Sequence, residues 1–103
     1  MLYNIFENIP DELSEELVET LCSSDAVRIE RIVSYGHSSD PDFWYQQEQN
    51  EFVILLSGSA QLELEDKTIS MKPGDYLNIP AQLKHRVATT AKDEKSIWLC
   101  VFY

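Results

Sequence analysis

Basic residues are scarce in this chain. Eight lysines and arginines stand against 18 aspartates and glutamates, which leaves a formal net charge of −10 at pH 7. A surface with this charge repels the phosphate backbone of nucleic acids and the headgroups of anionic lipids. The composition therefore predicts a protein that binds neither nucleic acid nor a membrane surface.

Long apolar runs and cysteines are scarce as well. The longest apolar run, residues 52–56, is far shorter than the roughly 18 residues that a membrane-spanning helix needs. The first residues are acidic and lack the basic start and small-residue cleavage site of a secretory signal. Two cysteines, Cys22 and Cys100, are too few for a disulfide scaffold, and we expect both to be buried, reduced thiols. These features predict a cytoplasmic location.

The length of the chain, 103 residues, is enough for one domain with its own core. The pattern of apolar residues divides this domain in two. The N-terminal segment, residues 1–25, has helical spacing, whereas residues 26–103 have the short alternating segments typical of strands. We therefore expect a single domain over residues 1–103, with a helical segment followed by a β-barrel.

The predicted helix depends on three leucines. Leu13, Leu17 and Leu21 recur every four residues with acidic residues between them, as on one face of an amphipathic helix. Pro10 suits the start of a helix, and the acids that follow it suit the positive end of the helix dipole. The pattern predicts one short α-helix over residues 11–22, with its leucines packed on the rest of the protein.

From residue 26 onward, short β segments alternate with turns. Leu62 and Leu64, for example, alternate with polar residues, and Pro73 with Gly74 forms a turn signal. No second helix is long enough to connect parallel strands. The expected strands are residues 27–35, 43–47, 51–58, 60–66, 68–71, 75–80, 84–90 and 96–103. The predicted fold class is all-β, an antiparallel barrel or sandwich.

Two short motifs lie on these predicted strands. Glu51 is followed by six residues and Gly58, whereas Gly74 is followed by five residues and Pro80, with His85 five positions further on. These spacings resemble the two sequence motifs of the cupin family: the end of the first motif and most of the second. The resemblance covers the predicted β part of the chain and implies a jelly-roll barrel of antiparallel strands.

In cupins, these motifs place three histidines and one glutamate around a divalent metal ion inside the barrel. The resemblance implies that Glu51 stands at the position of the glutamate ligand and His85 at that of the third histidine. A carboxylate and an imidazole on neighbouring strands suit Fe, Mn, Ni or Zn. Glu51 and His85 are therefore candidate metal ligands.

The first two histidines of the family pattern are replaced in this chain. Counting back from the glutamate with the three-residue spacing gives Tyr45 and Gln47, and the four-residue spacing gives Trp44 and Gln46. We favour the first pair because alternate residues of a strand point to one face, which makes Gln47 a third candidate ligand. An amide oxygen binds transition metals much more weakly than imidazole. The sequence thus predicts a degenerate site with a weakly held divalent metal, or a site without one.

The second motif also departs from the family pattern. Gln82 stands where the family has glycine, and Thr89 stands where it has asparagine. The other histidine of the chain, His37, lies in a predicted loop rich in Ser, Asp and Pro, where an exposed position is expected.

Three side chains are candidates for contact with a substrate: Tyr45, Arg31 and Trp98. Arg31 shares strand parity with Val33, which predicts that it points inward, and a buried arginine needs an acidic partner. Tyr45 and Trp98 lie on predicted strands, where aromatic residues form core or line a pocket. For all three, a structural role is the alternative.

Three functions fit these features. The first is a metal-assisted enzyme for a small molecule, such as an isomerase, lyase or dioxygenase, with Glu51 and His85 as ligands. The second is a metal-free binding or sensing module, in which the same two residues bind a polar ligand or act as base and acid. The third is a non-catalytic assembly protein. We favour a small-molecule site that can take a divalent metal, and the family resemblance implies a homodimer.

Overall fold

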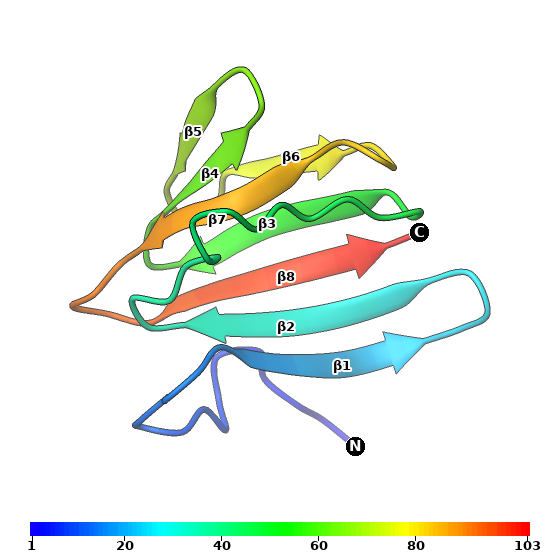
Figure 1. Ribbon diagram of the computed structural model, residues 1–103. Coiled ribbons are helices and arrows are strands. Elements are labelled where there is room, and N and C mark those ends of the chain that lie inside the picture. The colour runs from blue at the N-terminus through cyan, green and yellow to red at the C-terminus, as the bar shows by residue number, and fades with distance from the viewer.

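Two antiparallel β-sheets make up the computed structural model, which describes all residues from 1 to 103 (Figure 1). The larger sheet has the strand order β1-β2-β8-β3-β6, and the smaller sheet has the order β5-β4-β7. The strands are β1 (Leu17–Ser23), β2 (Arg28–Ser34), β3 (Glu51–Ser57), β4 (Ala60–Leu64), β5 (Thr68–Met71), β6 (Tyr76–Ile79), β7 (His85–Thr90) and β8 (Ser96–Phe102). The all-β antiparallel fold class predicted from the alternation is confirmed.

The core lies between the two sheets and follows the period-two alternation of the strands. Strand β8 contributes Trp98 and Cys100, its neighbour β3 contributes Val53 and Leu55, and Leu62 of β4 meets them from the smaller sheet. All five side chains are at least 95% buried, with exposed fractions from 0% to 4%. Burial of this kind supplies most of the free energy that favours folding, at about 25 cal/mol per Å² of apolar surface.

The predicted N-terminal helix over residues 11–22 is wrong. Leu17–Ser23 forms strand β1, which pairs with β2 at the edge of the larger sheet and carries a bulge between Thr20 and Cys22. Pairing satisfies the backbone groups that an uncovered β2 would expose, and the β-branched Val18 and Thr20 favour a strand. The structure contains no helix that is long and apolar enough to span a membrane.

The expected strand over residues 43–47 is a loop with a single bridge to the smaller sheet. The N–H of Tyr45 donates to the carbonyl of His85 at 2.7 Å, and the N–H of His85 donates back to Tyr45 at 3.0 Å. A third bond runs from the N–H of Gln82 to the carbonyl of Gln47 at 2.7 Å. These three bonds hold the loop across the open side of the barrel, next to the start of β7.

Arg31 points away from the barrel interior, contrary to the parity prediction. The residues of β2 whose side chains face the interior are Arg28, Glu30 and Ile32, which alternate with Arg31. The guanidinium of Arg31 lies beneath the N-terminal segment, where it donates to the carbonyls of Ile5 (3.0 Å) and Glu7 (2.7 Å) and pairs with the carboxylate of Glu19. The acidic partner that a buried arginine needs is thus on β1, and the contacts of Arg31 are structural.

The two cysteines differ in their surroundings. Cys100 is buried in the core, as expected, whereas Cys22 lies exposed on the edge strand β1. Both thiols are free. The prediction of burial fails for Cys22 because it assumed a helix packed on the barrel.

Candidate functional site

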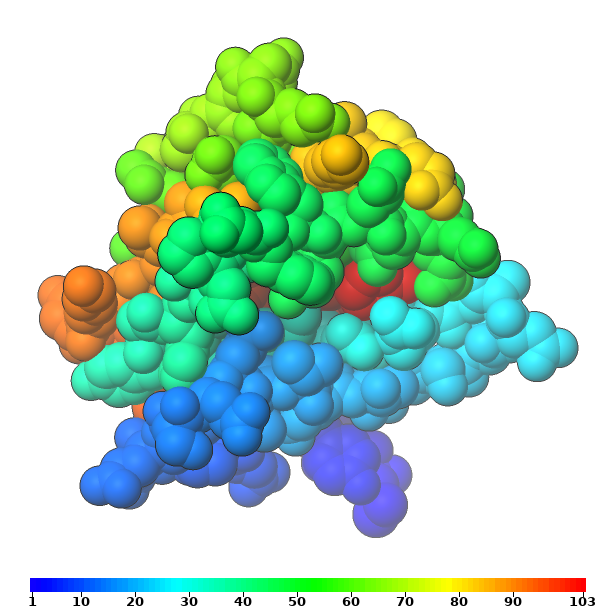
Figure 2. Space-filling model, viewed as in Figure 1, coloured from blue at the N-terminus to red at the C-terminus, as the bar shows by residue number.

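A pocket of about 260 Å³ opens between the two sheets. Figure 2 shows the hollow on this face, between the loop that precedes β3 (green) and strands β1 and β2 (blue and cyan), with atoms of β8 (red) at its floor. Ten of the 16 lining residues are hydrophobic, so the pocket offers an apolar body with a few polar groups. This is the usual composition of a small-molecule site.

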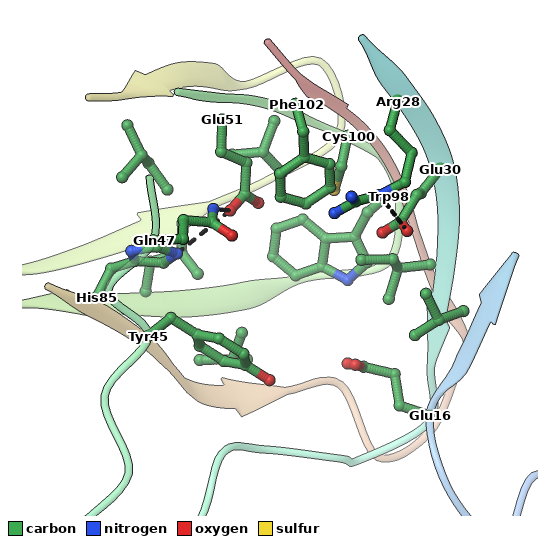
Figure 3. Close-up of a pocket in the computed structure, with 16 residues that line it drawn as sticks. Glu16, Arg28, Glu30, Tyr45, Gln47, Glu51, His85, Trp98, Cys100 and Phe102 are labelled. Carbon is green, nitrogen blue, oxygen red and sulfur yellow. Dashed lines mark hydrogen bonds and ion pairs between the residues drawn. The ribbon is translucent and has the colours of Figure 1, made fainter. Parts of the chain in front are cut away.

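His85, Glu51 and Gln47 form one polar end of the pocket (Figure 3). The Nε2 atom of His85 lies 3.3 Å from Oε1 of Glu51, and the amide of Gln47 donates to the same oxygen at 3.0 Å. Nδ1 of His85 lies 3.0 Å from the carbonyl oxygen of Leu83. This contact fixes the orientation of the ring, so that Nε2 points toward Glu51 in the pocket. The start of β3 positions the carboxylate, and the start of β7 positions the imidazole.

The pKa of His85 is raised above its ordinary value. Burial by itself lowers this pKa, but the hydrogen bonds to Glu51 and to the carbonyl of Leu83, with the negative charge of Glu51, outweigh it. The imidazolium is therefore more populated near neutral pH than that of a free histidine. The pair of His85 and Glu51 can therefore hold one proton and exchange it with a bound molecule.

Tyr45 covers this pair from the loop. Its ring stacks on the imidazole of His85, with ring centroids 5.7 Å apart and an interplanar angle of 26°, and Phe43 packs edge-on against it. Burial and the charges of Glu16 and Glu51 raise the pKa of the Tyr45 phenol. Tyr45 thus keeps its proton and presents a neutral O–H group.

The only arginine in the pocket wall is already paired. Nε of Arg28 donates to Glu30 at 2.9 Å, and its guanidinium lies over the ring of Phe102, 4.4 Å from the ring centroid. The Cys100 thiol is also in the wall, and burial with the nearby charges of Glu51 and Glu30 raises its pKa. The raised pKa favours the protonated thiol, which is a poor nucleophile.

The donor set does not fit a resident transition metal. Catalytic zinc sites use three protein ligands, and strong ligands are thiolate, imidazole and carboxylate. His85 and Glu51 are the only pair of this kind at the polar end, and no three His, Cys, Asp or Glu side chains are grouped closely enough to hold a metal ion. The amide nitrogen of Gln47 is directed to Glu51, so the three candidate ligands form a hydrogen-bonded set.

Most of the candidate site residues predicted from the sequence line the pocket. Tyr45 and Gln47 line it, whereas their alternatives Trp44 and Gln46 do not, and Trp98 forms part of the wall while Arg31 lies outside. Three charged lining residues are not expected from the sequence: Glu16, Arg28 and Glu30. Arg28 and Glu30 lie four and two residues before Ile32 and therefore share its face of β2.

Several proteins of known structure are similar to this chain. A candidate mannose-6-phosphate isomerase of Ralstonia eutropha JMP134 has 39% identity and a TM-score of 0.95, over 99% of this chain and 96% of that chain. A cupin superfamily protein of Desulfitobacterium hafniense DCB-2 has 23% identity and a TM-score of 0.77, over 91% and 82% of the two chains. The polyketide cyclase RemF of Streptomyces resistomycificus has 22% identity and a TM-score of 0.72, over 86% and 65%. The last two matches show a shared fold.

A comparison with curated protein sequences found no significant match. A family model, that of the cupin domain, does match the chain. It covers residues 31–102, which include every strand except β1 and the first residues of β2. This region contains both motifs with Glu51 and His85. The chain belongs to the cupin family.

Proposed function

We propose that the protein binds a small organic molecule in the pocket without a metal ion, and that His85 and Glu51 hold and move a proton at the polar end. The observation that carries this proposal is the contact of 3.3 Å between Nε2 of His85 and Oε1 of Glu51, inside a pocket whose lining residues are mostly hydrophobic. Each group is the partner of the other, as in an acid–base pair.

The size of the pocket supports a compact ligand. A volume of about 260 Å³ is just below the roughly 300–1,000 Å³ of most small-molecule pockets. The side chains of His85 and Glu51 are only 7% and 13% exposed, so a bound molecule would shield the pair from solvent. Electrostatic interactions strengthen when water is excluded, which favours proton transfer between the pair and a ligand.

The chemistry of the pair supports an isomerase or lyase type of reaction. Such reactions need one group that removes a proton and one that returns it, and a carboxylate beside an imidazolium provides both. The similar protein of Ralstonia eutropha, a candidate isomerase, is consistent with this class. Binding alone is the minimum that the proposal requires.

Thermal unfolding in the presence of a library of small organic molecules tests the proposal. A ligand of the pocket raises the melting temperature, because it binds the folded state alone. The rise disappears in Glu51→Gln and His85→Gln and persists in Glu65→Gln, which removes one negative charge from an exposed turn. Elemental analysis of the untagged protein measures the number of metal ions bound per chain. One metal ion per chain that is lost in both pocket variants would contradict a metal-free site, and a ligand whose effect survives both variants would contradict the assignment of this pair.

We further propose that the protein is a cytoplasmic homodimer. The family resemblance supports a dimer, and β1 lies at the end of the larger sheet with one edge unpaired. Sedimentation equilibrium measures the mass in solution. A monomer at all concentrations would contradict this part.

A further inference from the structure

The indole N–H of Trp98 has no acceptor within the chain. The side chain is 4% exposed and lies in the pocket wall, and its nitrogen is not among the polar atoms sealed inside the protein. In Figure 3 this nitrogen is on the side of the ring that faces Glu16, away from Glu51. Buried tryptophans usually donate this hydrogen bond. Because this N–H is open to the pocket, a bound ligand can accept its hydrogen bond in place of solvent.

Two more polar groups face the same part of the pocket. Figure 3 shows the Tyr45 hydroxyl directed toward the carboxylate of Glu16, and the charge of Glu16 is one of the causes that raise the pKa of this phenol. Oε2 of Glu16 accepts a hydrogen bond from the hydroxyl of Ser34 at 3.0 Å, and Oε1 has no partner within the chain. Trp98, Tyr45 and Glu16 thus form a second polar end, distinct from His85 and Glu51.

The donor and acceptor types at this second end select the ligand group. An indole only donates, an ionised carboxylate only accepts, and a phenol does either. A single ligand group that satisfies both Trp98 and Glu16 must accept one hydrogen bond and donate another. A hydroxyl does so. An ammonium has no lone pair for the indole, whereas a carboxylate or phosphate places negative charge beside Glu16.

The charges around the pocket disfavour anionic ligands in general. Three carboxylates line it: Glu16, Glu30 and Glu51. The two cationic side chains in the wall are already engaged, Arg28 with Glu30 and His85 with Glu51. A phosphate ester would lose its hydration and meet only the part of the Arg28 guanidinium that Glu30 leaves open, beside three carboxylates, and this costs free energy.

We propose that the ligand is a compact, neutral, hydroxylated molecule whose hydroxyl is bound by Trp98, Tyr45 and Glu16, and that the pocket rejects the phosphate esters of such molecules. This inference rests on the proposed function, because it names the ligand class of the same pocket. It separates this chain from an enzyme for phosphorylated sugars: the apolar walls and the second polar end suit the unphosphorylated compound.

The test uses matched pairs of probes in nuclear magnetic resonance titrations: mannose with mannose 6-phosphate, glucose with glucose 6-phosphate, and myo-inositol with its monophosphate. The chain has two tryptophans, Trp44 and Trp98, so Trp98→Phe assigns the two indole N–H signals. A neutral probe should move the Trp98 signal, and its phosphate ester should bind at least tenfold more weakly. Loss of one hydrogen bond to the ligand in Glu16→Gln or Tyr45→Phe should weaken binding of the neutral probe by about tenfold, and Glu65→Gln should leave it unchanged.

The outcomes separate this inference from the proposed function. If a phosphate ester binds as tightly as its neutral partner, or if only ligands without a hydroxyl bind, the inference fails while the binding function stands. The same holds if a neutral probe binds with no change in the Trp98 signal or in Glu16→Gln. If no molecule of either kind or of the wider library binds, the proposed function fails with it. Glu16 and Tyr45 are more exposed than Trp98, so their variants keep the test valid should Trp98→Phe fold poorly.

Discussion

Gln82 adopts a backbone conformation that glycine adopts without strain. Its φ angle is +69°, in the left-handed region, at the position where the cupin motif has glycine. The side chain is exposed and makes no hydrogen bond within the chain, whereas the backbone N–H binds Gln47 and the carbonyl accepts from the side chain of Gln46. Gln82→Gly therefore relieves strain, removes no side-chain contact and keeps both backbone bonds.

The expected gain in stability follows from two opposing terms. A residue with a Cβ in the left-handed region loses about 1–2 kcal/mol relative to its preferred conformation. Glycine has more conformational freedom in the unfolded chain, which costs about 0.5–1 kcal/mol on folding. The difference predicts that Gln82→Gly raises the free energy of unfolding by about 1 kcal/mol, or the melting temperature by about 4–8 °C in a domain near 100 residues.

Urea unfolding of the wild type, Gln82→Gly and Gln82→Ala measures this effect. Alanine also has a Cβ, so Gln82→Ala should leave the unfolding midpoint close to that of the wild type. Ligand binding should be unchanged in both variants, because residue 82 does not line the pocket. An unchanged or lower midpoint for Gln82→Gly, or an equal rise for Gln82→Ala, would refute the strain argument.

Three other perturbations test separate parts of the structure. The raised pKa of His85 implies that its pair with Glu51 stabilises the fold fully below the unfolded-state pKa of histidine, and that this stability is lost as the pH rises through the folded-state value. Chemical unfolding across this range should show the loss in the wild type, and an equal loss in Glu51→Gln would contradict it. Glu19→Ala leaves the Arg31 guanidinium, whose side chain is 6% exposed, without a counter-charge and should lower the free energy of unfolding by about 3 kcal/mol. Limited proteolysis should then cut the N-terminal segment faster, and an unchanged rate would argue against this anchor. In Gly58→Ala, the new residue has a φ of +83° and a Cβ only 2.6 Å from a backbone atom of β8. Unfolding experiments should therefore show that the free energy of unfolding falls by roughly 2–4 kcal/mol. A fall of less than about 1 kcal/mol would mean that the turn adjusts easily.

Much of the barrel could be predicted because its strands alternate clearly. The N-terminal segment could not, since residues four apart share a face in a strand as well as in a helix. Leu13, Leu17 and Leu21 therefore fit both patterns, and the deciding factor, the uncovered edge of β2, is a property of the tertiary structure.

The residues of the candidate site could likewise be predicted only in part. Glu51 and His85 could be predicted because both lie in short motifs with fixed spacing. Glu16 could not, because it precedes an unexpected strand and reaches the pocket through the pairing of β1 with β2. The direction of Arg31 was mispredicted because parity alone does not say which face of a strand is inside when both faces are covered.

The pocket wall takes side chains from nearly both ends of the chain, from Glu16 before β1 to Phe102 at the end of β8. β8 is the last of the eight strands to leave the ribosome, and it lies in the middle of the larger sheet between β2 and β3. A nascent chain without β8 therefore has neither the pocket floor nor a continuous sheet. A ligand of this pocket would stabilise only chains in which β8 has taken its place between β2 and β3.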